Sequence, residues 1–119
     1  MFARLTLCLA LLSTAAHADD YAVGQTFDNP MQIAYNEMAA FSYDGEGRPM
    51  IAVEVSSDFS GQVTLLIAET GFADDSVAGE RNHYVLTQQD GVWTLIYTEQ
   101  SFMCWRGLNT VTWQSGYCP

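Results

Sequence analysis

The sequence contains no lysine, and its 4 basic residues are all arginines, set against 14 aspartates and glutamates. Proteins bind nucleic acids and anionic membranes through basic side chains, so this composition excludes both as partners. A glycine-rich phosphate-binding loop is absent as well, and we expect no cofactor. The charge favours a basic protein as partner, although the same acidity also keeps chains soluble in salt-rich surroundings. The oligomeric state is left open.

Long apolar runs are absent except near the N-terminus, where residues 5–12 are almost unbroken in their hydrophobicity. This run precedes Ala16-His17-Ala18, the small-x-small pattern of a signal-peptide cleavage site. It is too short for a stable membrane anchor, which needs about 20 apolar residues. The sequence therefore predicts a signal peptide over residues 1–18 and cleavage after Ala18. What remains is a single periplasmic or secreted domain of residues 19–119 with no membrane insertion.

Cysteine is scarce, and only Cys104 and Cys118 follow the predicted signal peptide. An even pair in a small exported chain predicts a disulfide, because the compartment is oxidising. Closing a 15-residue loop stabilises a fold by roughly 3 kcal/mol in the chain-entropy model. The alternatives are a metal pair or a redox pair. No histidine lies near the two cysteines and they do not form Cys-x-x-Cys, so no metal site is expected.

Hydrophobic periodicity predicts one helix followed by strands. Asp28-Asn29-Pro30 is a helix-start signal, and Ile33, Ala34, Met38 and Phe41 recur near helical spacing, which predicts a helix over residues 30–42. The alternating residues 51–55 and the apolar residues 63–68 predict a first hairpin. Residues 72–80 are small, polar and acidic, and they predict a loop.

Asp90-Gly91 predicts a second hairpin, because this dipeptide is the strongest two-residue turn signal. Counting outward from this turn, we expect Gln89 to pair with Val92. The same count pairs Leu86 with Leu95, Val85 with Ile96 and Tyr84 with Tyr97. The predicted core face of this hairpin comprises Tyr84, Leu86, Trp93, Leu95 and Tyr97. Its predicted outer face comprises His83, Val85, Thr87, Thr94, Ile96 and Thr98.

The order of these elements predicts an α+β domain. In it, one N-terminal helix packs on a four-stranded antiparallel sheet made of two hairpins, closed by one disulfide. Cystatin-like and NTF2-like architectures are the nearest analogies, and they carry no functional implication.

Few residues offer catalytic chemistry. His83 is the one histidine beyond the signal peptide, and we expect it on the outer face of the hairpin rather than in an acid/base role. Asp74-Asp75, followed by Glu80-Arg81, is compatible with a divalent-cation loop or a carboxylate dyad, but it lacks the alternating ligand spacing of a calcium loop. The simpler interpretation is a turn cap with Arg81 folded back as an ion pair. We therefore expect no catalytic residues.

The C-terminal tail concentrates the residue types that dominate protein-binding surfaces. Trp105, Arg106, Trp113 and Tyr117 lie within or beside the predicted disulfide loop, and they are the candidate binding residues. The alternative is that these rings only cover the end of the sheet and the bridge.

The C-terminal half carries a resemblance to a known family. The motif Asp74-Asp75-Ser76-Val77-x-Gly79-Glu80-Arg81, the hairpin with Trp93, and Cys104-Trp105-Arg106-Gly107 before Trp113 and Cys118 make up the pattern. It resembles an uncharacterised family of small secreted bacterial domains. That family has no assigned activity, so the resemblance implies export, the hairpin and the disulfide, and no mechanism.

Two functional hypotheses follow. The first is a small non-catalytic binding or inhibitor-type module of the bacterial periplasm, because a stapled aromatic tail is present and an assembled catalytic set is not. The alternative is a small periplasmic hydrolase or transfer enzyme that uses His83 and the acids near Asp74.

Overall fold

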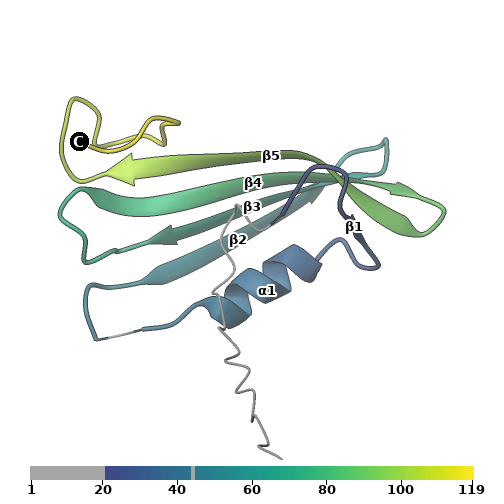
Figure 1. Cartoon of the computed structure of the whole chain (residues 1–119), viewed down its shortest axis with the longest axis horizontal. Coiled ribbons are helices and arrows are strands. Elements are labelled where there is room, and N and C mark those ends of the chain that lie inside the picture. The colour runs from purple at the N-terminus through teal and green to yellow at the C-terminus, as the bar shows by residue number, and fades with distance from the viewer. Residues whose placement is uncertain (1–20, 44) are drawn as a thin grey trace, which may run out of the picture.

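The computed structural model of the chain describes residues 21–43 and 45–119 (Figure 1). The predicted signal peptide lies outside these residues, so it and its cleavage site stay predictions. No helix in the described part of the chain has the length and hydrophobicity needed to cross a membrane. The elements are β1 (Thr26–Phe27), α1 (Gln32–Ala40), β2 (Met50–Ser57), β3 (Gln62–Thr70), β4 (Val77–Gln89) and β5 (Val92–Cys104).

The strands form one antiparallel sheet in the order β1-β5-β4-β3-β2. The sheet curls into a half-barrel, and the short helix lies along its concave side (Figure 1). β1 and β2 occupy opposite edges, so the segment that joins them, including α1, must cross this side. The predicted α+β fold, with a four-stranded sheet packed on a helix, is wrong, and the cystatin-like and NTF2-like analogies fall with it. β4 and β5 have 13 residues each, and strands of that length twist and curl a sheet.

Helix α1 lies within the predicted range but buries a different side chain. Ile33 and Ala34 are buried as expected, whereas Met38 is 41% exposed. Glu37 is buried in its place, at 6% exposure. Viewed down the helix axis, Ile33, Glu37 and Ala34 fall within an arc of about 100°, with Glu37 between the other two, whereas Met38 lies about 40° outside this arc. Helix geometry therefore buries the acid instead of the methionine.

The Asp90-Gly91 hairpin has the predicted register near its turn and a different one further on. The pairs from Gln89–Val92 to Leu86–Leu95 are confirmed. A β-bulge then inserts Ile96, so that Val85 pairs with Tyr97 and Tyr84 pairs with Thr98.

The predicted pairs Val85–Ile96 and Tyr84–Tyr97 are therefore wrong. A bulge adds one residue to one strand, and this turns every later side chain of that strand to the opposite face. Tyr97 consequently lies on the outer face and is 41% exposed.

Strand β4 begins earlier than the sequence predicted. Its first residues, Val77 to Glu80, fall in the expected loop of residues 72–80, and this part of the prediction is wrong. Gly79 allows this part of β4 to pair with β3. A Cβ at this position would lie only 2.6 Å from the Glu69 carbonyl oxygen of β3 and would clash with it. A small, polar segment can thus continue a strand where the neighbouring backbone approaches closely.

The hydrophobic core lies between α1 and the concave face. Tyr84, Leu86 and Leu95 are fully buried, which confirms their predicted placement, and Trp93 packs against the core while partly buried. The ring of Tyr21 meets the ring of Tyr84 edge to face, with centroids 5.9 Å apart. The other core residues are Ile33, Ala34, Leu65 and Ile67.

Candidate functional site

His83 lies on the outer face of the sheet, as the sequence predicted. It pairs across the strands with Glu99, and its ring meets the Tyr97 ring edge to face, with centroids 5.2 Å apart. Asp74 precedes β4, whereas His83 follows the first residue of that strand by six positions, or about 20 Å at the rise of a β-strand. The structure therefore does not bring His83 together with the acids near Asp74.

Asp74 caps the turn that leads into β4. Its Oδ1 accepts the backbone N–H groups of Ser76 at 2.7 Å and Val77 at 2.8 Å. These bonds favour the ionised carboxylate and hold the pKa of Asp74 below its usual value. Within the described residues, no three His, Cys, Asp or Glu side chains are grouped so that they could hold a metal ion. The guanidinium of Arg81 lies 5.0 Å from the ring centre of Trp113, where a cation–π contact replaces the expected ion pair with these acids.

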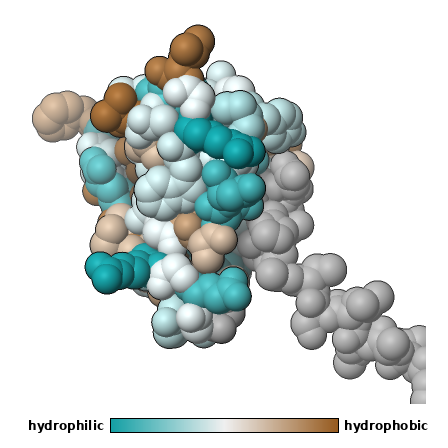
Figure 2. Space-filling model, turned by 90° about the vertical axis from the view of Figure 1, so that its left-hand side faces the viewer, coloured by the Kyte–Doolittle hydropathy of each residue, from teal (hydrophilic) through white to brown (hydrophobic). Residues whose placement is uncertain are grey.

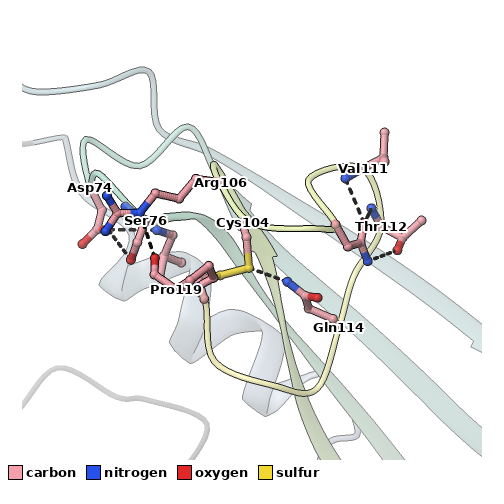
Figure 3. The surroundings of a disulfide bond; sticks show 11 residues. Asp74, Ser76, Cys104, Arg106, Val111, Thr112, Gln114 and Pro119 are labelled. Carbon is pink, nitrogen blue, oxygen red and sulfur yellow. Dashed lines mark hydrogen bonds between the residues drawn. A yellow bond between two sulfur atoms is a disulfide. The ribbon is translucent and has the colours of Figure 1, made fainter.

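The disulfide between Cys104 and Cys118 is confirmed. It joins the end of β5 to the C-terminal tail, which folds back beside the sheet (Figure 3). Gln114 pairs with Phe102 through two backbone hydrogen bonds of 2.7 and 2.9 Å, so the returning tail briefly adds to the edge of β5. The Trp105 N–H donates to the Ser76 carbonyl at 2.8 Å. These contacts place the loop of residues 105–117 firmly at one end of the half-barrel.

The four candidate binding residues of the tail have different environments. Trp105 is 54% exposed and Tyr117 is 92% exposed. Trp113 is half-buried under the Arg81 guanidinium. Arg106 donates from Nε to the Pro119 carbonyl at 2.9 Å, and its charge acts on Asp74 (Figure 3). Trp105 and Tyr117 are therefore available for contact, whereas Trp113 and Arg106 help to hold the tail.

Sequence reasoning missed two apolar residues of the same loop, Leu108 and Val111. Leu108 is fully exposed and Val111 is 81% exposed. Figure 2 looks onto this end of the molecule and shows apolar side chains at its upper edge, where the tail lies in Figure 1. We call the exposed apolar residues of the loop, Trp105, Leu108, Val111 and Tyr117, the loop patch. The signal that could have found it is the presence of apolar residues in a segment without helical or strand periodicity.

A second feature missed by sequence reasoning is a group of acids on the concave face. The Tyr84 hydroxyl donates to Glu37 Oε1 at 2.6 Å. Burial raises the pKa of Glu37 above its ordinary value, while hydrogen bonds from Tyr84 and Asn82 oppose the rise. The charges of Glu69 and Glu80 raise it further. These two acids face each other across β3 and β4, so three carboxyl groups gather under the helix.

The raised pKa of Glu37 predicts how stability depends on pH. The folded chain holds the Glu37 proton more tightly than the unfolded chain, so the contribution to stability is full below the unfolded value of 4.5 and is lost as pH rises through the folded pKa. Each pKa unit of difference between the two states is equivalent to about 1.4 kcal/mol. Glu37→Gln keeps an acceptor for Tyr84 and removes this loss. We expect the variant to be more stable than the wild type at pH 7, and the advantage to vanish toward pH 4.

Denaturant unfolding followed across this pH range measures the effect. The matched control is Glu54→Gln, since Glu54 is exposed on β2. A Glu37→Gln curve that stays parallel to the wild type at every pH would show that Glu37 does not titrate differently in the folded state.

A cavity of about 400 Å³ opens beside this acidic group. It lies between the C-terminal end of α1, the segment after it and the loop that follows β3. Phe41, Pro49 and Phe72 contribute apolar walls, and Glu46, Glu69 and Asp74 contribute carboxylates. Asp74 also stands beside Arg106, so the cavity and the disulfide loop adjoin at the same end of the molecule (Figure 3).

Comparison of the chain with family models, with curated proteins and with solved structures finds no match. The resemblance of residues 74–118 to a family of small secreted domains therefore stays a prediction, and the function has to be argued from the molecule itself.

Proposed function

We propose that the protein is a small exported binding module of the bacterial periplasm, of the non-catalytic or inhibitor type, and that the loop patch is its contact surface. The observation that carries the proposal is the exposure of four large apolar side chains on one covalently closed loop. Apolar side chains that gather on a surface mark interaction sites. Trp and Tyr are also among the residues that most often dominate binding energy.

The disulfide supports this proposal through preorganisation. Binding by a flexible loop loses part of its interaction energy to ordering. Here the bridge, the Gln114–Phe102 pairing and the Arg106 bond to Pro119 order the loop before any partner arrives. The excess of acidic residues favours a basic protein as partner. The alternative of a hydrolase or transfer enzyme loses its support, because His83 and Asp74 lie on different parts of the molecule.

Capture from periplasmic extract by the purified exported protein, followed by affinity measurement with the captured partner, tests the proposal. We expect Trp105→Ala and Tyr117→Ala each to weaken the complex by about 2 kcal/mol, or roughly 30-fold, without changing the melting midpoint. The physical reason is that Trp105 is 54% and Tyr117 92% exposed in the free protein, and this area would be buried in the complex.

The matched control is Phe59→Ala. Phe59 is fully exposed on the turn between β2 and β3, at a distance along the sheet from the loop patch. Phe59→Ala should bind the captured partner with the same affinity as the wild type. Equal weakening by Phe59→Ala, or an early melting of Trp105→Ala that accounts for the lost binding, would return the tail to a purely structural role.

A further inference from the structure

β2 is an open edge of the sheet that lacks the features by which proteins protect such edges. It is the last strand in the order β1-β5-β4-β3-β2, so no described segment pairs with its outer side (Figure 1). Natural edge strands are kept short, or they carry a bulge, a proline or an inward-pointing charge. β2 has 8 residues, contains no proline and pairs with β3 without a register shift. Its outer side can therefore accept another strand.

The opposite edge of the sheet is better protected. β1 pairs with Trp93 and Thr94 near one end of β5, and Gln114 pairs with Phe102 near the other. The bulge at Ile96 distorts the strand between these two places. The contrast singles out β2 as the edge to which a further strand can add.

Antiparallel pairing determines which residues of β2 present free backbone groups. In such a ladder, hydrogen-bonded pairs alternate with pairs whose N–H and C=O groups point away from the partner strand. The Asp58 N–H donates to the Gln62 carbonyl at 3.1 Å, so the even-numbered residues of β2 form the hydrogen-bonded pairs with β3. Ile51, Val53 and Val55 therefore direct both backbone groups toward the open edge.

The side chains along this edge are mostly apolar. Ile51 and Val53 are partly buried against the core cluster, and Val55, on the same face, is 46% exposed. Met50 is 60% exposed on the other face. Glu54 is the one charged residue of the strand. The edge thus combines unpaired backbone groups with apolar surface that a neighbouring strand would cover.

We propose that β2 pairs with β2 of a second copy of the chain, so that the protein forms a two-fold symmetric dimer with one continuous antiparallel sheet. A two-fold axis at Val53 pairs this residue with its own copy, Ile51 with Val55, and Met50 with Ser56. In this register the residues with outward backbone groups meet one another, and each such pair exchanges two N–H···O bonds. The dimer does not depend on the proposed binding function.

Charge and backbone geometry favour this register over its neighbours. An axis at Glu54 would place two carboxylates directly opposite each other, which destabilises a strand pair. An axis at Val53 instead places Glu54 opposite Ala52 and β-branched side chains opposite one another on the concave face. Axes between two residues would match outward groups with groups already bonded to β3. Axes at Ala52 or Val55 pair a shorter part of the strand.

The size and charge of the contact determine the expected affinity. It involves residues 50–56 of each copy, whereas a stable interface has about 20–30 residues a side. The chain has 14 acidic and 4 basic residues, so two copies repel each other at low salt. At an ionic strength of about 0.15 M this repulsion is screened beyond about 8 Å. We therefore expect a reversible dimer with a dissociation constant on the order of 10–100 μM.

The dimer keeps both loop patches accessible. Met50 aligns through Thr70 and Gly79 with Met103, so β2 begins at the end of the sheet that carries the disulfide loop. The antiparallel arrangement places this end of one copy beside the opposite end of the other. The two loop patches therefore lie at opposite ends of the dimer.

Sedimentation equilibrium of the exported protein, from about 1 to 1000 μM and at about 0.15 M salt, measures the association. Val53→Pro removes the N–H at the two-fold axis from both copies, and an edge strand tolerates proline where the N–H points outward. Val53→Ala is the matched control, because it shortens the side chain and keeps this N–H. We expect the dissociation constant of Val53→Pro to be at least tenfold higher than that of Val53→Ala. Melting curves check that both variants fold.

Cysteine cross-linking tests the register itself. Met50 and Ser56 of the second copy would form a pair without mutual hydrogen bonds, with Cα atoms about 4.5 Å apart, which a disulfide can bridge. Both side chains are exposed, so the substitutions should not disturb the fold. A mixture of Met50→Cys and Ser56→Cys should cross-link on oxidation. Neither variant should do so alone, because each cysteine lies about 20 Å from its own copy.

Four results would overturn the proposal. The wild type could stay monomeric at every concentration, or the two Val53 variants could dimerise equally. The mixture of cysteine variants could fail to cross-link, or each variant could cross-link by itself as well as the mixture does. Trp105→Ala identifies the competing contact: if it dissociates the dimer and Val53→Pro does not, the copies associate through the loop patch instead of β2.

Discussion

Leu65→Ala should lower the free energy of unfolding by about 2–5 kcal/mol, while Leu66→Ala should lower it by only about 1 kcal/mol. Leu65 is fully buried at the centre of the concave face, between its register partners Val55 and Tyr84. Truncation there removes packing within the core cluster, to which Ile33 and Ala34 of the helix also belong, and leaves a void. Leu66 is the next residue and points to the outer face, where it is half-buried.

This pair is a sharp test because the two residues are chemically identical and adjacent. Urea unfolding at pH 7, followed by circular dichroism and tryptophan fluorescence, measures both losses. Similar costs for the two variants would mean that the helix does not cover the face assigned to it, and that both sides of the sheet are equally packed.

Removing the disulfide should cost the fold about 3 kcal/mol. The bridge closes a 15-residue loop, and the chain-entropy model assigns this amount to a loop of that length. Cys104→Ala/Cys118→Ala is the variant of choice, because Cys104 is almost fully buried and serine would place a hydroxyl there. The hydrogen-bonded pairing of β2 with β3, of β3 with β4 and of β4 with β5 does not depend on the bridge, so the variant should still fold.

Chemical reduction provides the control for this variant. Reduction should lower the stability of the wild type by about the same amount and leave the double variant unchanged. The variant should also bind the partner more weakly than its lower stability alone would explain, because its loop patch is no longer held in place. An unaltered unfolding midpoint on reduction would contradict the role assigned to the bridge.

Several features could be predicted because they depend on neighbours in the sequence. Asp90-Gly91 specifies a tight turn by backbone conformation alone; Asp90 adopts φ 54° and Gly91 φ 79°. The register next to the turn follows directly from it. It fails beyond Leu86–Leu95, because the bulge at Ile96 depends on how the long strands bend around the core. No local signal distinguishes Ile96 from its neighbours.

The candidate site was only partly visible in the sequence. The stapled tail and its aromatic residues could be named, but not which of them face solvent. Trp113 lies under Arg81, a residue more than thirty positions away in the chain. Likewise, Glu69 and Glu80 become neighbours only when β3 pairs with β4, and Glu37 joins them only when the helix packs against the sheet.

The sequence by itself determined the short-range features of this protein: the acidic charge, the hairpin turn and a cysteine pair close enough to bridge. Each depends on composition or on residues within about fifteen positions. The tertiary structure decided the curl of the sheet, the bulge, the burial of Glu37 and the cavity beside it. These arise because long antiparallel strands twist, and because the segment between the two edge strands has to cross the concave face. That crossing brings together acidic residues that lie far apart in the sequence, so their proximity cannot be predicted from it.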